Sequence, residues 1–467
     1  MGRKKSQVDH QALGSLSRRF FAPIDIASLV FFRILFGAVM FIEVWRYFSN
    51  DWIGRYYIEP TFHFTYYGFG WIRPWEGHGM YWHFLVLGLL SFFILIGFCY
   101  RLSMTLFFLG FTYVFLLDQT QYLNHFYLIS LISLIMIFVP AHHSVSIDAW
   151  WRPRLRSETV PAWALWALLA QMGIAYFYAG IAKLNEDWLR GEPMRMWLAN
   201  REDLTLAGPF LAVGKLFTKE SVVYFFTYGG LLLDLFIVPA LLWRKTRPYA
   251  FAAALMFHLM NSILFNIGIF PWFAIVATLM YFSPSWPRRI LNWPRKEEKA
   301  ESKSPGLSAQ LRGRRLTAAI FGIYFSIQIL LPLRHFLYPG PVNWTEEGHR
   351  FAWHMKLRNK TSKANFVIRD PASGKSWTIN GREYITRRQL RKMGHRPDMI
   401  LQFCHHLADQ YRQKGYPDVE VRARIRASLN GRKRQLLVDP KVDLAAMERT
   451  LRHVPWIMPL TEPLPMP

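Results

Sequence analysis

A single lysine stands at the end of a long segment without ionised side chains. Residues 160–182 contain no Asp, Glu, Lys or Arg, and Lys183 follows them in the phrase AYFYAGIAKLNEDWLRGEPM. On a continuing helix, Tyr176, Gly180, Lys183 and Asp187 share one stripe, where Gly180 leaves space beside the amine. Loss of hydration in such a place favours the neutral amine, which can act as a base. The alternative is an interfacial lysine whose ammonium group extends to the lipid headgroups.

Other polar side chains stand inside apolar segments, where an ionisable group is costly and is therefore a functional candidate. His125 follows Asn124 at the start of one such segment, and His258 and Asn261 share one face of a helix. Asp234 stands in the apolar phrase GGLLLDLF. For each of these groups, a satisfied structural role is the competing interpretation.

The elements that must position these groups are membrane-spanning helices. A bilayer core about 30 Å thick requires roughly 20 apolar residues in helical form. Arg33 and Glu43 inside the first helix are expected to pair with other helices or to snorkel. The sequence predicts eight or nine helices, at Ala27–Phe48, Met80–Cys99, Ser103–Leu117, His125–Pro140, Pro161–Ala182, Ser221–Trp243, Tyr249–Phe265, Gly268–Phe282 and Leu316–Leu333.

The chain divides into three parts: a basic tail (1–26), a transmembrane domain (27–335) and a C-terminal domain (336–467). In the last part, FVIRDPASGKSWTIN is typical of two strands joined by a turn, and TRRQLRKMG and DMILQFCHHLADQYRQKG are typical of helices. Asn430-Gly431, between alternating apolar and basic residues, predicts a second hairpin. We therefore expect a mostly α polytopic membrane protein with a C-terminal extramembrane α+β domain.

Lys and Arg are distributed unevenly between the loops. They concentrate in the N-terminal tail and in the phrases WWRPRLR, WRKTRP and PRRILNWPRKEEK, which nine helices would place on one side. That side is expected to be cytoplasmic, so the Lys183 loop and the C-terminal domain lie outside. The net charge is +25, and residues 336–467 hold 24 Lys and Arg against 12 Asp and Glu. Such a charge favours anionic lipid headgroups or an acidic substrate, and no nucleic-acid recognition motif accompanies it.

The sequence predicts no metal site. Cys99 and Cys404 stand alone, without the CxxC or His/Cys spacing of a metal or redox centre.

The phrase GIAKLNEDWLRGEPM resembles the segment around the active-site lysine of the vitamin K-dependent γ-glutamyl carboxylases. Further segments resemble that family in family order: GFCYRLS, VFLLDQTQYLNHFYL, GGLLLDL, FHLMNSILFNIGIF, LPLRHFLYPGPVNWTEEGHRFAWHMKLR, RRQLRKMGHRPDMILQF and LLVDPKVD. The resemblance covers nearly the whole chain. It points to the bacterial branch, which is described as carrying a horizontally transferred transmembrane (HTTM) domain.

The resemblance implies γ-carboxylation of glutamate residues in a peptide or protein, coupled to oxygenation of reduced vitamin K to its 2,3-epoxide. The cofactor would be phylloquinone or menaquinone hydroquinone, with O2 and CO2 as co-substrates and no metal. The lysine would deprotonate the hydroquinone, a phenol-like acid with a pKa near that of tyrosine, about 10. The expected location is the bacterial inner membrane, with the C-terminal domain extracytoplasmic and with lipid and quinone as partners.

The family's functional positions are carried over residue by residue. Lys183 matches the catalytic base. Asn124 and His125 match a pair that hydrogen-bonds the quinone oxygen, with His125 stabilising its charged form. Tyr176 and His258 match further positions of the cofactor pocket.

The likeness is weaker where the glutamate substrate would bind. Trp353 and Met355 match residues near that site, but Arg358 stands in place of a histidine and Lys360 in place of an arginine. Arg358 could still bind a carboxylate. Ala182 replaces the first of two adjacent lysines found in animal members. These departures leave two alternatives: a quinol epoxidase or oxygenase without glutamyl carboxylation, and a non-catalytic membrane quinone-binding protein.

Overall fold

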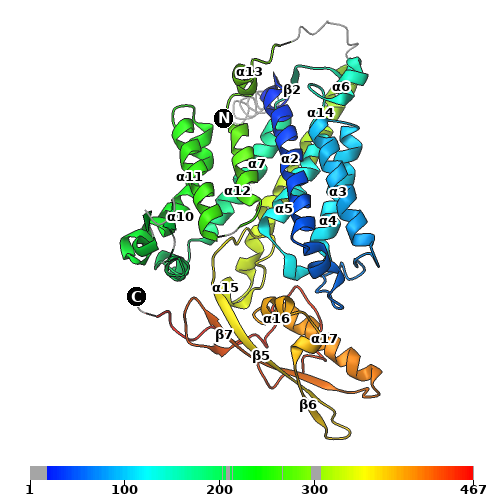
Figure 1. Ribbon diagram of the computed structural model, residues 1–467, viewed down its shortest axis with the longest axis vertical. Coiled ribbons are helices and arrows are strands. Elements are labelled where there is room, and N and C mark those ends of the chain that lie inside the picture. The colour runs from blue at the N-terminus through cyan, green and yellow to red at the C-terminus, as the bar shows by residue number, and fades with distance from the viewer. Residues whose placement is uncertain are drawn as a thin grey trace, which may run out of the picture.

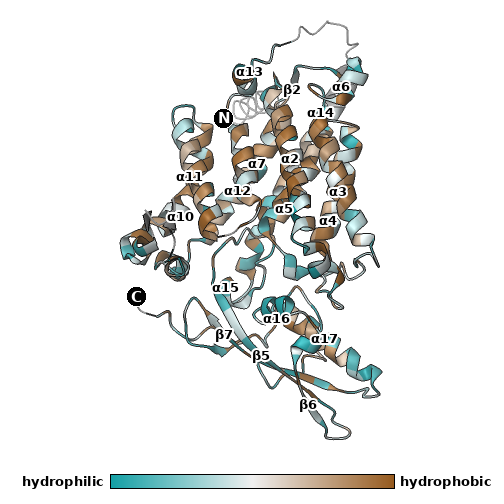
Figure 2. Cartoon of the chain, viewed as in Figure 1, coloured by the Kyte–Doolittle hydropathy of each residue, from teal (hydrophilic) through white to brown (hydrophobic). Residues whose placement is uncertain are grey.

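The computed structural model describes residues 18–465, except residues 202, 204, 207–210, 213, 266 and 296–306. A domain of long helices occupies one end of the molecule, and a smaller domain that contains the main sheet occupies the other (Figure 1). Apolar residues dominate the long helices, whereas polar residues are frequent in the smaller domain (Figure 2). Most of the basic tail expected at residues 1–26 lies outside the described residues.

Seven helices in the described part of the chain are long and apolar enough to cross a membrane. They are α2 (Ala27–Ser49), α3 (Gly79–Ile96), α4 (Tyr100–Leu117), α7 (Trp163–Ala182), α10 (Glu220–Leu242), α11 (Arg247–Phe265) and α14 (Leu307–Leu333). Two further apolar helices are shorter: α5 (Asn124–Phe138), and α12 (Phe270–Thr278) with its 3-10 extension η6 (Leu279–Tyr281). All nine predicted segments are therefore helical, but only seven have spanning length.

The two short apolar helices begin at the same cavity. The 15 residues of α5 reach roughly 22 Å at a rise of 1.5 Å per residue, less than the roughly 30 Å of a bilayer core. His125 near the start of α5 and Phe270 at the start of α12 both line this cavity. Non-helical backbone at membrane depth is tolerated where it lines such a space. The short helices thus bring polar and aromatic side chains to the interior.

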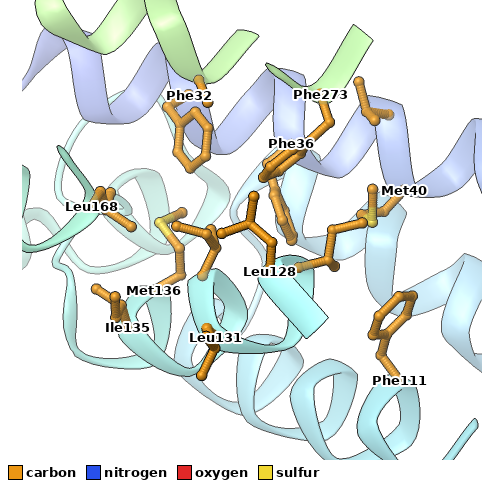
Figure 3. Packing of buried hydrophobic residues seen from close by; sticks show 14 of the residues in the cluster. Phe32, Phe36, Met40, Phe111, Leu128, Leu131, Ile135, Met136, Leu168 and Phe273 are labelled. Atoms are coloured by element: carbon orange, nitrogen blue, oxygen red, sulfur yellow. The ribbon is translucent and has the colours of Figure 1, made fainter. Parts of the chain in front are cut away.

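Helix α5 lies at the centre of the helical domain. Eleven of its 15 residues are buried, as expected for a helix that is apolar all round. Figure 3 shows its side chains packed among large apolar residues of α2, α4, α7 and α12. The labelled core residues are Phe32, Phe36, Met40, Phe111, Leu128, Leu131, Ile135, Met136, Leu168 and Phe273.

The charged residues of α2 have structural partners. Arg33 is fully buried and donates hydrogen bonds to the carbonyl oxygens of Ala141 (3.2 Å) and Val145 (2.6 Å). Glu43 pairs with Arg46 of the same helix at 2.6 Å rather than with another helix.

Short elements complete the helical domain. Strand β1 (Pro23–Asp25) pairs with β2 (Thr159–Pro161), and β3 (Thr205–Leu206) pairs with β4 (Leu211–Ala212). The short helices are η1 (Gly54–Ile58), η2 (Gln119–Gln121), α6 (Ile147–Trp151), η3 (Pro153–Leu155), α8 (Glu186–Leu189), α9 (Met194–Ala199), η5 (Gly214–Thr218), α13 (Trp286–Ile290) and η7 (Arg334–Leu337).

The C-terminal domain is a four-stranded antiparallel sheet, in the order β6-β5-β7-β8, packed against helices. Alternate residues of β7 are buried, and the arginines between them are partly or fully exposed. This alternation supplies one apolar face for α17 to cover. The elements are α15 (Val342–Thr345), β5 (Lys360–Arg369), β6 (Ser376–Ile379), η8 (Gly381–Glu383), α16 (Arg387–Met393), α17 (Pro397–Gln413), β7 (Glu420–Leu429) and β8 (Gln435–Leu436). The expected α+β domain is confirmed.

The hairpin predicted around Asn430-Gly431 is present: β7 pairs with β8, and Asn430 (φ 50°) and Gly431 (φ 82°) are the central residues of a turn in which the Leu429 carbonyl oxygen accepts from the Arg432 N–H at 3.1 Å. β7 ends at Leu429 and β8 begins at Gln435, so residues 430–434 form the connection. Asn430 accepts a hydrogen bond from the backbone N–H of Asn359 at 2.8 Å. This contact joins the turn to the segment that precedes β5.

The segment between α2 and α3 joins the two domains. Phe62 and Phe64 pack into the core of the C-terminal domain. Gln389 Nε2 donates to the carbonyl oxygen of Phe62 at 2.6 Å, and Arg449 Nη2 donates to that of Thr65 at 2.8 Å. These contacts hold the C-terminal domain against the ends of the membrane helices.

Candidate active site

A large cavity of about 1460 Å³ lies where the helical domain meets the C-terminal domain. It exceeds the roughly 300–1,000 Å³ of ordinary ligand pockets. Aromatic and aliphatic side chains form most of its wall, from α2, α5, α7, α10, α11 and α12. The charged, histidine, tyrosine and amide side chains in the wall include Glu43, Arg46, Asn124, His125, Tyr176, Lys183, Asp234, His258, Asn261, Lys356, Arg388 and Lys392.

Lys183 caps the C-terminal end of α7 and is buried, with 5% of its surface exposed. Its Nζ donates to the carbonyl oxygen of Ala179 at 3.2 Å and to Oδ2 of Asp234 on α10 at 2.5 Å. The ring of Trp188 lies 5.3 Å from the same nitrogen. The side chain is therefore paired with a carboxylate at the cavity wall, which is not the arrangement of a snorkelling lysine.

Gly180 allows α10 to approach α7 closely. A Cβ atom at this position would lie 2.6 Å from Cδ2 of Leu235 and 3.1 Å from the backbone nitrogen of Leu235. The space expected beside the amine is thus occupied by Leu235. Because Leu235 directly follows Asp234, the close approach of the two helices brings the Asp234 carboxylate to Lys183.

Asp187 does not continue the predicted helical stripe, because α7 ends before Lys183 and Asp187 belongs to the separate helix α8. Its carboxylate faces the C-terminal domain. Arg432 donates to it from Nη1 and Nη2, both at 2.6 Å, and Asn430 donates from Nδ2 at 2.7 Å. Asp187 therefore connects the Lys183 loop with the C-terminal domain and does not line the cavity.

Asn124 and His125 begin α5 at the cavity wall. Asn124 donates from Nδ2 to the carbonyl oxygen of His354 at 3.0 Å and accepts from the hydroxyl of Tyr122 at 2.9 Å. The ring of His125 stacks on Phe270, with centroids 5.7 Å apart. Within the described part of the chain, the His125 ring nitrogens make no hydrogen bond. They are available to a ligand, whereas the Asn124 amide has one N–H left to offer.

Tyr176 and His258 form a buried pair. The Tyr176 hydroxyl lies 2.7 Å from Nε2 of His258. Nδ1 of His258 is buried and has no hydrogen-bond partner among the described residues. The His258 ring packs perpendicular to that of Phe270, with centroids 5.8 Å apart, so this phenylalanine contacts both histidines. Since an unsatisfied buried nitrogen is costly, this arrangement favours a polar ligand atom beside His258.

Of the three residues predicted near the glutamate site, only Met355 lines the cavity. Trp353 is buried, with its ring 5.0 Å from that of Tyr127, and is absent from the cavity wall.

Arg358 is also outside the cavity wall, and its guanidinium already holds a carboxylate. Nε donates to Oε1 of Glu346 at 2.8 Å, and Nη2 donates to Oε2 of the same group. Lys360 adds a contact to Glu346 at 3.4 Å. Burial alone would raise the pKa of Glu346, but Arg358 and Lys360 lower it to about 2. The structure therefore does not bring Arg358 together with the other predicted site residues.

Six predicted residues meet in one cavity: Asn124, His125, Tyr176, Lys183, His258 and Met355. The sequence marks Asp234 as a carboxylate at membrane depth but does not identify Lys183, 51 residues away, as its partner. It gives no sign that Phe270 contacts both histidines.

Two family models match the chain. The HTTM domain matches residues 21–286, and the vitamin K-dependent gamma-carboxylase, lumenal domain matches residues 313–463. No solved structure matches the chain significantly. The first match alone covers more than half of the 467 residues, and the two regions correspond to the helical domain and to α14 with the C-terminal domain. The cavity with its buried lysine lies where these regions meet, and the chain belongs to the vitamin K-dependent gamma-carboxylase family as a member with an HTTM domain.

Proposed function

We propose that this membrane protein carboxylates the γ-carbon of glutamate residues in a peptide or protein, coupled to the oxygenation of vitamin K hydroquinone to the 2,3-epoxide. The family supplies the carboxylase class. The observation that carries the finer proposal is a single cavity shared by the Lys183–Asp234 pair, His125 and the Tyr176–His258 pair.

The cavity suits a quinol that carries a long hydrocarbon tail. Ile42, Phe225 and Met256 line it, yet 50%, 66% and 61% of their surfaces are exposed. Because these residues belong to membrane helices, this side of the cavity opens toward lipid. In its wall, His125 and Phe270 offer stacked rings beside which an aromatic headgroup can pack. The residues present therefore fit reduced vitamin K.

When bound, the hydroquinone and O2 supply a base strong enough to remove a hydrogen from the glutamate γ-carbon, which no side chain could do directly. The role of Lys183 is milder. A buried pair of charges carries a large desolvation penalty. In this proposal Asp234 relieves the penalty by taking a proton from Nζ across the 2.5 Å contact, which leaves a neutral amine. Nζ can then accept the proton of a substrate hydroxyl whose pKa is near that of tyrosine, about 10.

His125 lines the same cavity, and we propose that it donates a hydrogen bond to the substrate oxygen. A donor held by stacking on Phe270 needs no reorganisation as negative charge develops on that oxygen. Met355, Trp188 and Phe226 add apolar wall nearby. An apolar wall limits water, which would quench both a strong base and a carbanion.

We place the protein in the bacterial inner membrane with the C-terminal domain extracytoplasmic. The loops that follow α6, α10 and α13 lie at the end of the helical domain opposite the C-terminal domain (Figure 1). These loops carry Arg152, Arg154, Arg244, Lys245 and Arg295. An excess of basic residues in short loops favours the cytoplasmic side.

The proposal is tested with purified protein, vitamin K hydroquinone, O2, labelled CO2 and a short glutamyl peptide. Formation of epoxide together with labelled peptide is the expected result. Epoxide without labelled peptide would support the second candidate, a quinol epoxidase, which the engagement of Arg358 by Glu346 favours. Absence of both products would indicate a non-catalytic quinone-binding protein.

A further inference from the structure

Three cations line the cavity from the C-terminal domain: Lys356, Arg388 and Lys392. Arg388 and Lys392 are four residues apart on α16, so they share one face of that helix. Lys356 comes from the segment before β5. All three belong to the same cavity wall as Lys183, which sits on the membrane side.

No carboxylate among the described residues pairs with these three cations. The two carboxylates in the cavity wall are engaged elsewhere: Glu43 binds Arg46 at 2.6 Å, and Asp234 binds Lys183 at 2.5 Å. Arg388 and Lys392 are partly buried, and cations in such places are normally paired. This end of the cavity therefore holds uncompensated positive charge.

Arg388 is held in place by uncharged contacts. Its Nη2 donates to Oε1 of Gln121 at 2.8 Å, and its guanidinium lies 4.4 Å from the ring centroid of Tyr56. Its Nε is buried and has no partner among the described residues. A rigid guanidinium with an unused donor is suited to a carboxylate ligand.

Lys392 is partly buried, whereas Lys356 is exposed. Burial, followed by the neighbouring Arg396 and Arg388, lowers the pKa of Lys392 to about 7, so an arriving anion would favour its charged form. Lys356 is exposed, with Nζ near the rings of Trp197 (5.4 Å) and Phe265 (5.2 Å). Because Lys356 is exposed and lines the cavity, an incoming ligand can reach the cluster through this residue.

We propose that Lys356, Arg388 and Lys392 bind the side-chain carboxylate of the acceptor glutamate. The inference rests on the proposed carboxylation and gives the acceptor role to this cluster in place of Arg358. A glutamate whose carboxylate binds here lies at the end of the cavity that the C-terminal domain lines. Its γ-carbon can then face the cavity interior, whose wall includes Lys183. The cluster also offsets the second negative charge of the dicarboxylate product.

The test is a binding measurement on the full-length protein in detergent. Two short fluorescent peptides are compared, one with glutamate and one with glutamine at the acceptor position. We expect the wild type to bind the glutamyl peptide about tenfold more tightly, as a charge-assisted hydrogen bond allows. Arg388→Gln and Lys392→Gln should remove this preference, whereas Lys392→Arg should retain it.

Arg391→Gln is the matched control, because Arg391 is exposed on the same helix and does not line the cavity. It should keep the preference and the thermal unfolding midpoint.

If the wild type prefers glutamate and both glutamine variants keep that preference while remaining folded, the cluster is not the acceptor site, although carboxylation still stands. If the wild type shows no preference and forms epoxide alone, both the cluster and the carboxylase proposal fall. Millimolar bicarbonate is then added to both peptide complexes. If it displaces the glutamyl and the glutaminyl peptide equally, the cluster binds a small anion rather than the acceptor glutamate, and the proposal is overturned.

Discussion

Arg432 holds Asp187 with both terminal nitrogens, each 2.6 Å from a different carboxylate oxygen. The pair is buried, and Asn430 from the same turn adds a third hydrogen bond at 2.7 Å. Asp187 stands four residues after Lys183, whereas Arg432 follows β7 in the C-terminal domain. The loop after the candidate base is thus fixed by the domain that is proposed to receive the peptide.

Asp187→Asn should destabilise the protein and slow its reaction. The change leaves the Arg432 guanidinium buried without a counter-charge, which costs about 3–5 kcal/mol. Because Trp188 beside Asp187 packs near Lys183, epoxide formation should also fall. Thermal unfolding and epoxide yield check both effects. Neutralising both partners, in Asp187→Asn with Arg432→Gln, should restore part of the stability; simple additivity of the two losses would show that they are not coupled.

Lys183→Ala should abolish epoxide formation at neutral pH. A general base contributes roughly 10²–10⁴ in rate. Activity should recover in part toward pH 10, where a phenol-like substrate ionises without help. The measurement is the epoxide yield across a pH series, with Lys183→Arg as control, since a guanidinium keeps its proton and should not restore the rate. Wild-type rates in Lys183→Ala would remove the residue from the mechanism.

Asp234→Asn should lower epoxide formation about a hundredfold, within the range of a lost acid–base partner. The amide can neither accept a proton from Nζ nor balance the ammonium charge. Asp234→Glu keeps a carboxylate and should retain part of the rate. Initial rates with saturating quinol check this order, and an unchanged rate in the asparagine variant would contradict the proposed proton transfer.

Gly180→Ala should impair activity without altering any group that reacts. The new Cβ would lie 2.6 Å from Leu235, so α10 must move away from α7 and take Asp234 with it. Gly173→Ala on the same helix is the control, because its Cβ would meet Val238 at an ordinary 3.5 Å. We expect the control to match the wild type in epoxide yield. Equal activity of both variants would show that the helix contact does not set the Lys183–Asp234 pair.

Arg358→Gln should weaken the C-terminal domain rather than change the preference for a glutamyl peptide. Glu346 has its pKa lowered from 4.5 to about 2, so its ion pairs stabilise the fold fully above pH 4.5 and are lost as the pH falls toward 2. Without Arg358 this lowering shrinks, and acid unfolding should begin at higher pH. Circular dichroism over an acid titration measures the shift. Selective loss of glutamyl-peptide binding in a stable Arg358→Gln protein would return this arginine to the acceptor site.

Hydropathy and alternation were sufficient to predict most of the elements. The nine apolar segments are all helices, and FVIRDPASGKSWTIN (residues 366–380) contains the two predicted strands, although β5 begins earlier than predicted, at Lys360. These features are local, because each depends on residues within one turn or one strand. The sequence predicted the turn at Asn430-Gly431 but not the partners that Asn430 takes from distant segments, Asn359 and Asp187.

The candidate site also has features that the sequence predicts and features that only the tertiary structure shows. The sequence by itself determined that a lysine, two histidines and a tyrosine stand at membrane depth, since their apolar neighbours are adjacent in the chain. Only the tertiary structure decided that Lys183 pairs with Asp234, that Arg358 is held by Glu346 and that uncompensated cations enter the cavity from α16. These pairings depend on how closely helices pack and how two domains dock, and such contacts between distant residues leave no periodic signal in the chain.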